Sequence, residues 1–222
     1  MNERPKSIID KISGLDDLVT SLGEPVYRAR QIKAGIFHRL ADSYQEMTDI
    51  PARLRDRLSE NGPLHCLHPL HLVKSKDGTV KGLFSLLDGN TVEAALMLYR
   101  RSGSEGRRAT ICVSTQVGCV VGCPFCATGG QGFVRNLSSG EIIDQVLYFA
   151  RYLRDDPRNT ATNHSTAVTN IVFMGMGEPL ANYDELLSAI RTLNAPDGLG
   201  LGARSMTVST AGLPHNLSLI HI

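Results

Sequence analysis

Three cysteines within one short run constrain what this chain can fold into more than any other feature. Cys119, Cys123 and Cys126 follow the pattern C-x3-C-x2-C, with glycines before, between and after them. A structural zinc site takes four ligands in a closed tetrahedron, so three thiolates alone leave such a site incomplete. A [4Fe–4S] cluster can be held by the same thiolates, and with only three of them one iron stays open to a small molecule. The spacing therefore favours a three-cysteine iron–sulfur cluster, and a zinc site completed by a distant histidine is the alternative.

The cysteines follow a strand-like segment, and strands then alternate with helices along the rest of the chain. Strands are expected at 110–114, 169–174 and 206–209, and helices at 138–154 and 183–193. Ser138 and Glu141 fit a capping box at the start of the first helix. This alternation predicts a parallel sheet of βαβ units with functional loops at the carboxyl ends of its strands. A complete barrel needs more strands than these. The predicted fold class is therefore α/β, a partial (β/α) barrel truncated after about three strands.

The residues before the barrel segments fall into two groups. Residues 1–62 carry three short helical segments, at 15–22, at 25–40 and from 51 to near 61, which predict a small N-terminal helical domain. Gly23 is expected to end the first of them. Residues 63–108 contain two turn signals, at 76–78 and 88–90, which predict an antiparallel β-hairpin region. The expected domains are therefore 1–62, 63–108 and an incomplete core at 109–222. Polar loops are expected at 102–106 and 155–166.

Composition narrows the classes of protein to which the chain can belong. The formal net charge is +1, so nucleic-acid binding would have to come from local patches. No apolar run is long enough for a membrane span, and the first residues lack the apolar core of a signal peptide. Five cysteines, an odd number with three of them clustered, argue against a secreted disulfide framework. We therefore expect a cytoplasmic protein without a membrane contact.

Basic side chains are spread over the N-terminal helices. A solvated helix face is the alternative interpretation of such a charge run. The side chains are Arg28, Arg30, Lys33, Arg39, Arg53, Arg55 and Arg57.

Two further loops follow expected strands and carry groups suited to binding a ligand. Gly175 and Gly177 remove side chains where a ligand would approach, and Glu178 offers a carboxylate to the α-amino group of a bound amino acid. An ordinary turn is the alternative for this segment. Ser209 and Thr210 close the third strand, and their hydroxyls either bind the same ligand or cap a helix.

Cys112 and Glu93 are two further candidates. Cys112 lies on the strand that leads into the cysteine run, and the residues leave open whether it is a reactive thiol or a small buried side chain. Glu93 stands in an apolar strand, where the residues alone favour a solvated carboxylate over a tuned acid or base. The histidines between residues 65 and 71 lack the spacing of a metal site, and Cys66 is interpreted as structural.

These segments together resemble the RlmN/Cfr family of radical-SAM methyltransferases, which modify adenosine in ribosomal and transfer RNA. The resemblance runs from about Tyr27 to Gly212. It rests on residues 27–32 with 47–51, 77–79 with 92–94, 112–119 with 132–137, and 174–179. Other radical-SAM enzymes share the three cysteines but not these surroundings. The resemblance implies methylation at C2 of adenosine in 23S rRNA and tRNA. The Cfr branch acts at C8, and the shared motifs do not separate the two.

The resemblance also implies a role for each candidate residue. The implied ligands of the [4Fe–4S] cluster are Cys119, Cys123 and Cys126. The implied contacts to S-adenosylmethionine are Gly177, Glu178 and Ser209. One S-adenosylmethionine would methylate an enzyme cysteine. A second would yield a 5′-deoxyadenosyl radical that activates this methyl group for addition to adenine. Glu93 would be the proton acceptor, and Cys112 would release the product through a transient disulfide with the methyl-carrying cysteine.

The implied partners are RNA and an electron donor such as flavodoxin, with the basic N-terminal helices as the RNA-facing surface. The family's methyl-carrying cysteine and later strands are not among the 222 residues, and residues 213–222 depart from the family pattern. We therefore expect a C-terminally truncated fragment that does not turn over on its own. A non-catalytic protein that binds zinc or an iron–sulfur cluster is the remaining alternative.

Overall fold

A mixed sheet of six strands forms the centre of the protein in the computed structural model, which describes residues 4–100, 107–156 and 168–218. The order is β1-β2-β3-β4-β7-β8, antiparallel from β1 to β4 and parallel from β4 through β7 to β8. The strands are β1 (Leu67–Lys74), β2 (Val80–Leu86), β3 (Thr91–Arg100), β4 (Arg107–Cys112), β7 (Asn170–Phe173) and β8 (Met206–Val208). The three parallel strands confirm the predicted α/β class with a partial barrel. The expected loop at 102–106 and most of the one at 155–166 lie outside the described residues.

The antiparallel hairpins and the parallel strands belong to one continuous sheet. The two predicted turns join β1 to β2 and β2 to β3. Ala95 of β3 lies opposite Cys112 of β4, and Cys112 in turn lies opposite Val172 of β7. The sheet thus continues across residue 108, where the hairpin region was expected to end. The three-part domain division stays a prediction.

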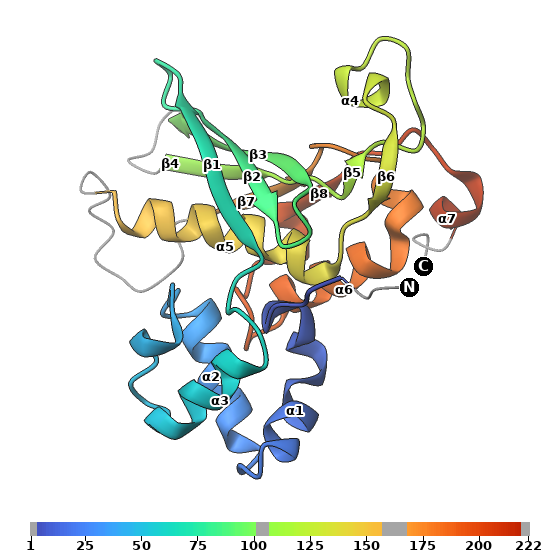
Figure 1. Cartoon of the computed structure of the whole chain (residues 1–222). Helices are drawn as coiled ribbons and strands as arrows, with labels where there is room; N and C mark the ends of the chain where they lie inside the picture. The colour runs from blue at the N-terminus through green and yellow to red at the C-terminus, as the bar shows by residue number, and fades with distance from the viewer. Residues whose placement is uncertain (1–3, 101–106, 157–167, 219–222) are drawn as a thin grey trace.

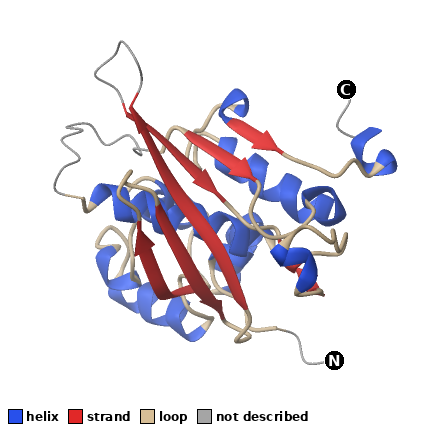
Figure 2. Ribbon diagram, turned by 90° about the horizontal axis from the view of Figure 1, so that it is seen from above, coloured by secondary structure: helices blue, strands red, loops and turns tan. Residues whose placement is uncertain are grey.

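Two long helices lie along one face of this sheet (Figure 1). They are α5 (Ser139–Arg154) and α6 (Tyr183–Asn194), which confirms both predicted helices. Seen from above, the strands cross in front of these helices (Figure 2). Aromatic rings fix the contact, because the ring centroid of Phe84 on β2 lies 4.7 Å from that of Tyr148 and 5.9 Å from that of Phe149 on α5. Alternate residues of β2 and β3, such as Lys81 and Glu93, point to the other, open face.

The N-terminal helices lie beyond α5 and α6, on the side away from the sheet (Figure 1). The three predicted helices are present, and Gly23, with a φ of +69°, follows the first of them as expected of a C-terminal stop. The elements are η1 (Ile9–Gly14), α1 (Leu15–Ser21), α2 (Tyr27–Phe37), η2 (Tyr44–Glu46) and α3 (Ala52–Glu60), where η marks a 3-10 helix.

The start of α5 is built from the predicted capping box and from the N-terminal segment. The Ser138 hydroxyl accepts a hydrogen bond from the Glu141 N–H, and the Glu141 carboxylate accepts one from the Ser138 N–H. Asp10 of η1 accepts a hydrogen bond from the Ser138 hydroxyl. A Cβ at Gly140 would lie 2.6 Å from the Asp10 nitrogen, so a glycine is needed for η1 to approach the helix this closely.

A second, two-stranded sheet, which was not predicted from the sequence, flanks the cysteines. Its strands are β5 (Gln116–Gly118) and β6 (Phe133–Asn136), with the one-turn helix α4 (Ala127–Gly130) between them. The other short elements are η3 (Pro179–Asn182), η4 (Ala203–Ser205) and α7 (Pro214–Ser218). Among the helices of the described residues, none has the length and apolar character required to cross a bilayer.

Candidate functional site

Three loops meet at the carboxyl ends of the parallel strands. We call them the cysteine loop (residues 119–132, after β4 and β5), the glycine turn (174–178, after β7) and the β8 turn (209–212). The Gly175 N–H donates to the Val113 carbonyl at the end of β4, at 3.0 Å. The carboxyl ends of parallel strands are where ligands bind in such sheets. The structure therefore brings the cysteines, Gly177, Glu178 and Ser209 to one edge of the sheet.

The cysteine loop is closed at its base by backbone contacts. The Cys119 N–H donates to the Gly132 carbonyl at 2.9 Å. Gly118 has a φ of +74°, and a Cβ there would lie 1.9 Å from the same carbonyl oxygen, so only glycine allows the two arms of the loop to approach. Inside the loop, the Cys126 N–H donates to the Cys123 carbonyl at 3.1 Å and forms a tight turn. The loop thus has a fixed base beneath the three thiols.

The donor set of this loop fits a three-thiolate metal centre in its chemistry. All three thiols are free, and Cys126 is exposed. Backbone N–H groups of Gly129 and Thr128 hydrogen-bond the Cys126 sulfur and lower its pKa, which favours the thiolate that metals bind. Within the described ranges, no three His, Cys, Asp or Glu side chains are already grouped around one point as metal ligands. Holding a cluster therefore requires the thiols to turn toward one another.

The glycine turn packs too closely on its neighbours to carry side chains at two of its positions. A Cβ at Gly175 would lie 2.7 Å from the Ser114 hydroxyl oxygen, and a Cβ at Gly177 would lie 2.6 Å from the Cβ of Gln116. Gly177 also has a φ of +105°, which side-chain-bearing residues rarely adopt. Both glycines are therefore required by close approach to the segment between β4 and the cysteine loop.

Glu178 is held by the β8 turn. Its carboxylate is buried and accepts hydrogen bonds from the Thr210 hydroxyl at 2.7 Å, the Ala211 N–H at 2.8 Å and the Leu180 N–H at 2.9 Å. Ser209 is exposed at the beginning of the same turn. Contact with a ligand amino group, the role implied for Glu178, stays a prediction. Such a contact would add a cation to a carboxylate that already accepts three hydrogen bonds.

Cys112 and Glu93 lie on the open face of the sheet. Cys112 is opposite Ala95, and Glu93 lies two residues before Ala95 on the same strand, so both side chains point to one face. Burial raises the pKa of the Cys112 thiol, and a hydrogen bond from the Met174 backbone offsets part of the effect. The Glu93 carboxylate forms an ion pair with Lys81, at 2.9 Å. The solvated carboxylate favoured from the residues alone agrees with its partial exposure.

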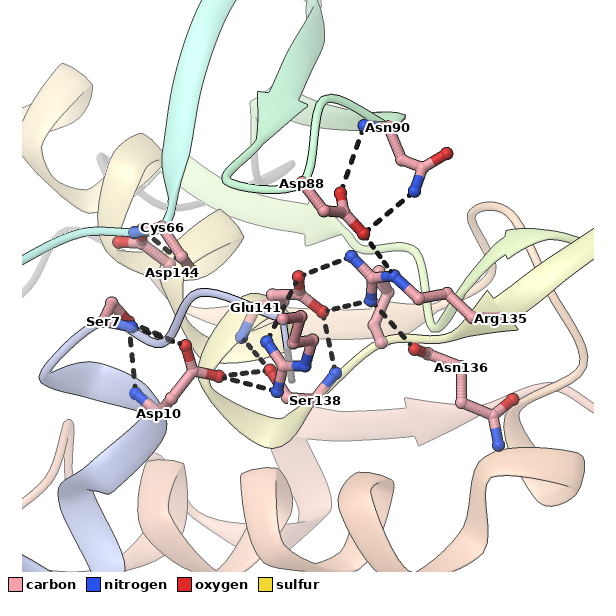
Figure 3. A network of polar contacts seen from close by, with 12 residues as sticks. Ser7, Asp10, Cys66, Asp88, Asn90, Arg135, Asn136, Ser138, Glu141 and Asp144 are labelled. Atoms are coloured by element: carbon pink, nitrogen blue, oxygen red, sulfur yellow. Dashed lines mark hydrogen bonds and ion pairs between the residues drawn. The ribbon is translucent and has the colours of Figure 1, made fainter. Parts of the chain in front are cut away.

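Arg135 anchors the return strand β6 to the body of the protein (Figure 3). It binds both carboxylate oxygens of Glu141 at 2.8 Å and the carboxylate of Asp88, in the β2–β3 turn, at 2.7 Å. Burial opposes ionisation of Asp88, but hydrogen bonds from Arg135 and Asn90 outweigh it and lower the pKa of Asp88 to about 2. No sequence pattern predicts this anchor, because its two partners come from separate segments, the β2–β3 turn and α5.

His65 and Cys66 lie in a different buried network, below the start of β1. The fully buried Asp144 carboxylate accepts hydrogen bonds from the N–H groups of Cys66 and Leu67, at 2.8 and 3.1 Å. His65 Nδ1 lies 2.6 Å from the same carboxylate, and His65 Nε2 lies 3.0 Å from the Ala41 carbonyl. These residues tie the N-terminal helices and β1 to α5, as the structural interpretation of Cys66 anticipated.

Most of the basic side chains on the N-terminal helices have partners within the protein. Lys33 pairs with Asp197, Arg39 pairs with Asp49, and Arg28 hydrogen-bonds Gln31. Arg55 and Arg57 donate to backbone carbonyls. Arg30 and Arg53 are exposed. A surface that faces RNA would therefore depend mainly on these two.

Comparisons with known proteins agree with this geometry. Residues 11–62 match the family model described as "Ribosomal RNA large subunit methyltransferase N-terminal domain". Curated relatives named "Probable dual-specificity RNA methyltransferase RlmN" include those of Chloroflexus aurantiacus, 47% identical over 203 residues, and Thermobifida fusca, 48% identical over 200 residues. These alignments cover 91% and 89% of this chain but 51% and 52% of the relatives. The chain thus spans about half the length of the curated relatives it matches.

A solved structure agrees with them on the fold. A radical SAM methyltransferase from Sphaerobacter thermophilus superimposes with a TM-score of 0.84 at 43% identity, covering 94% of this chain and 58% of that one. The aligned part includes both the N-terminal helices and the sheet with its loops, because only a small fraction of this chain is left out. Over the part that it spans, the chain is therefore similar to the RlmN proteins and shares the fold of this radical SAM methyltransferase.

Proposed function

We propose that this chain carries the cofactor-binding part of a radical-SAM RNA methyltransferase. The longer protein would add a methyl group to C2 of adenosine in 23S rRNA and tRNA. The observation that supports this most is the meeting of the cysteine loop and the glycine turn at the carboxyl ends of β4 and β7. The chain covers about half of its relatives, so activity and substrates are proposed for the whole protein.

In this proposal the three loops hold the cofactors. Cys119, Cys123 and Cys126 would ligate a [4Fe–4S] cluster, while Gly177, Glu178 and Ser209 would contact S-adenosylmethionine. The bound pair would supply the radical chemistry that methylation of an aromatic carbon requires, because such a carbon offers no nucleophile for a polar transfer. The fixed base of the cysteine loop would limit the movement of the segment that carries the three thiols.

The open face of the sheet would carry the proton and thiol chemistry. Glu93 would accept a proton, and for this it must release the ammonium group of Lys81. Cys112 has a raised pKa, so it is a thiol at neutral pH and must lose its proton before it can attack a sulfur atom. Both side chains can reach a substrate that enters over the open face, because both point to it from adjacent strands.

Metal loading tests the cofactor part of the proposal on the chain itself. After anaerobic loading with iron and sulfide, we expect about four irons per chain and a visible absorption band. C123A should lose both, while C66A should retain them, because Cys66 is buried in the Asp144 network. Undiminished iron in C123A would refute the ligand assignment. A zinc-loaded, colourless protein would favour the non-catalytic alternative.

The RNA part of the proposal rests on the exposed basic side chains. Charge reversal at Arg30 and Arg53 should weaken RNA binding and lower the slope of log K against log salt by about one for each phosphate that is no longer neutralised. Reversal at Lys33, which pairs with Asp197, is the matched control and should change this slope less. For the longer protein, mass spectrometry of digested RNA decides the position of the methyl group, and 8-methyladenosine would contradict C2 modification.

A further inference from the structure

Gln116 lies between two of the three loops, the cysteine loop and the glycine turn. It is fully buried although it is polar. Its side-chain oxygen accepts a hydrogen bond from the Glu178 N–H in the glycine turn, at 2.9 Å, and one from the Val120 N–H in the cysteine loop, at 3.3 Å. One side-chain atom therefore touches both segments that carry the predicted cofactor ligands.

The third contact of Gln116 fixes the orientation of its amide. The amide nitrogen donates to the Asn136 side-chain oxygen at 2.8 Å, on the return strand β6. Asn136 is next to Arg135, which binds Glu141 and Asp88 (Figure 3). The amide is thus anchored at its nitrogen to the body of the protein and presents its oxygen to the two loops. Only a side chain of this length with both a donor and an acceptor can do this.

The glycine at 177 belongs to the same arrangement. A Cβ there would approach the Cβ, Cγ and nitrogen of Gln116 to between 2.6 and 2.7 Å. The backbone also links the two segments, because the N–H groups of Thr115 and Gln116 both donate to the Met176 carbonyl. The glycine turn therefore packs directly on Gln116, and a displacement of one must move the other.

We propose that Gln116 is a positioning residue that couples the cysteine loop to the glycine turn. Ordering of either loop then favours the ordered state of the other, even before a ligand bridges them. By linkage, a group held by the cysteines and a molecule held by the glycine turn each bind more tightly in the presence of the other. The inference rests on the proposed function for what these two ligands are, but the coupling itself belongs to this chain.

Amide hydrogen exchange in the metal-free protein tests the coupling without any cofactor. In Q116M, exchange should become roughly tenfold or more faster at both Val120 and Glu178, because both amides lose their acceptor. Q145M is the control, because it removes another fully buried side-chain amide, whose partners are Ser114 and Glu141. In Q145M, exchange at the backbone N–H groups of Val120 and Glu178 should not be selectively faster. Acceleration at only one of the two amides in Q116M would overturn the inference.

A second arm uses Zn²⁺ alone as a probe of the cysteine loop, because zinc binds thiolates. In the wild-type protein, zinc should slow exchange in the cysteine loop and also at Glu178. In Q116M it should slow exchange in the loop only. Equal slowing at Glu178 in both proteins would overturn the coupling. Q116N keeps the amide donor and acceptor on a side chain one carbon shorter, which cannot reach Asn136 and both loops at once. It should also lose the response at Glu178, which keeps the test valid if Q116M does not fold. Failure to load iron, by contrast, would count against the proposed function and not against the coupling.

Discussion

The substitution D144N is the sharpest test of how the N-terminal helices are joined to the core. Asp144 is fully buried, and its carboxylate accepts from two backbone N–H groups and lies 2.6 Å from His65. Asparagine has nearly the same shape, but its NH₂ group would face donors. Removing one member of a buried ionic network costs about 3–5 kcal/mol, since its partners are left without a match. We expect a loss of this size in the free energy of unfolding.

Urea unfolding followed by circular dichroism measures this loss. With a slope of about 1–3 kcal/mol per molar urea, the midpoint should fall by at least about 1 M. The matched control is D184N, at an exposed position in the first turn of α6, which should change stability by no more than about 0.5 kcal/mol. A change in D144N as small as that of the control would refute the idea that this network joins the two parts.

The pH dependence gives a second check on the same substitution. Burial opposes ionisation of Asp144, but His65, Arg151 and the Cys66 N–H outweigh it and lower its pKa. A lowered pKa in the folded state means that the stabilisation is present above the unfolded value of about 3.9 and is lost as the pH falls through the folded value. The wild-type protein and D144N should therefore converge in stability at acid pH. A constant difference down to the lowest pH at which the protein folds would contradict the assigned direction.

Three further predictions concern the candidate site. G177A should lower the unfolding midpoint, because an L-residue at positive φ costs about 1–2 kcal/mol before any clash is counted. G130A should leave the unfolding midpoint unchanged, because there is open space around the added methyl group. Equal midpoints for G177A and G130A would contradict the close approach of Gly177 to Gln116. Asp88, with its pKa lowered to about 2, should contribute stability that is lost as the pH falls from about 4 to 2. D88N should remove this part of the profile, and an unchanged profile would contradict it. In the metal-free protein, alkylation of Cys126 should reach its plateau at lower pH than that of Cys112, which mass spectrometry of the labelled peptides measures. The reverse order would contradict the two pKa directions.

Local signals predicted much of the fold correctly. The capping box at Ser138 and Glu141 marks the start of α5 because both of its hydrogen bonds close within four residues. The two hairpin turns and the glycine after α1 are likewise local. The small sheet of β5 and β6 was missed because its strands are too short to show alternation and pair across the cysteine loop.

The site was predictable in its residue types but not in its contacts. The positions of the cysteines and Glu178 after strands placed them at one edge of a parallel sheet. That the β8 turn already hydrogen-bonds the Glu178 carboxylate depends on a contact with residues more than thirty positions away. The ion pair of Glu93 with Lys81 depends on hairpin register, which periodicity does not give. Gln116 stands between Thr115 and Val117, so no apolar run marks it, and its burial and its contacts with both loops depend on the tertiary structure.

The continuous sheet has a consequence for the order in which the chain folds. Strands β1 to β4 form a meander whose neighbours are adjacent in sequence, so their pairing closes only short loops. The pair β4–β7 instead joins Thr110 to Asn170, across the long helix α5. Contacts between residues so far apart along the chain form slowly, because the loop entropy is lost before the contact is gained. The meander can therefore form first and present one edge of β4 as a template on which the parallel strands, and with them the glycine turn, assemble.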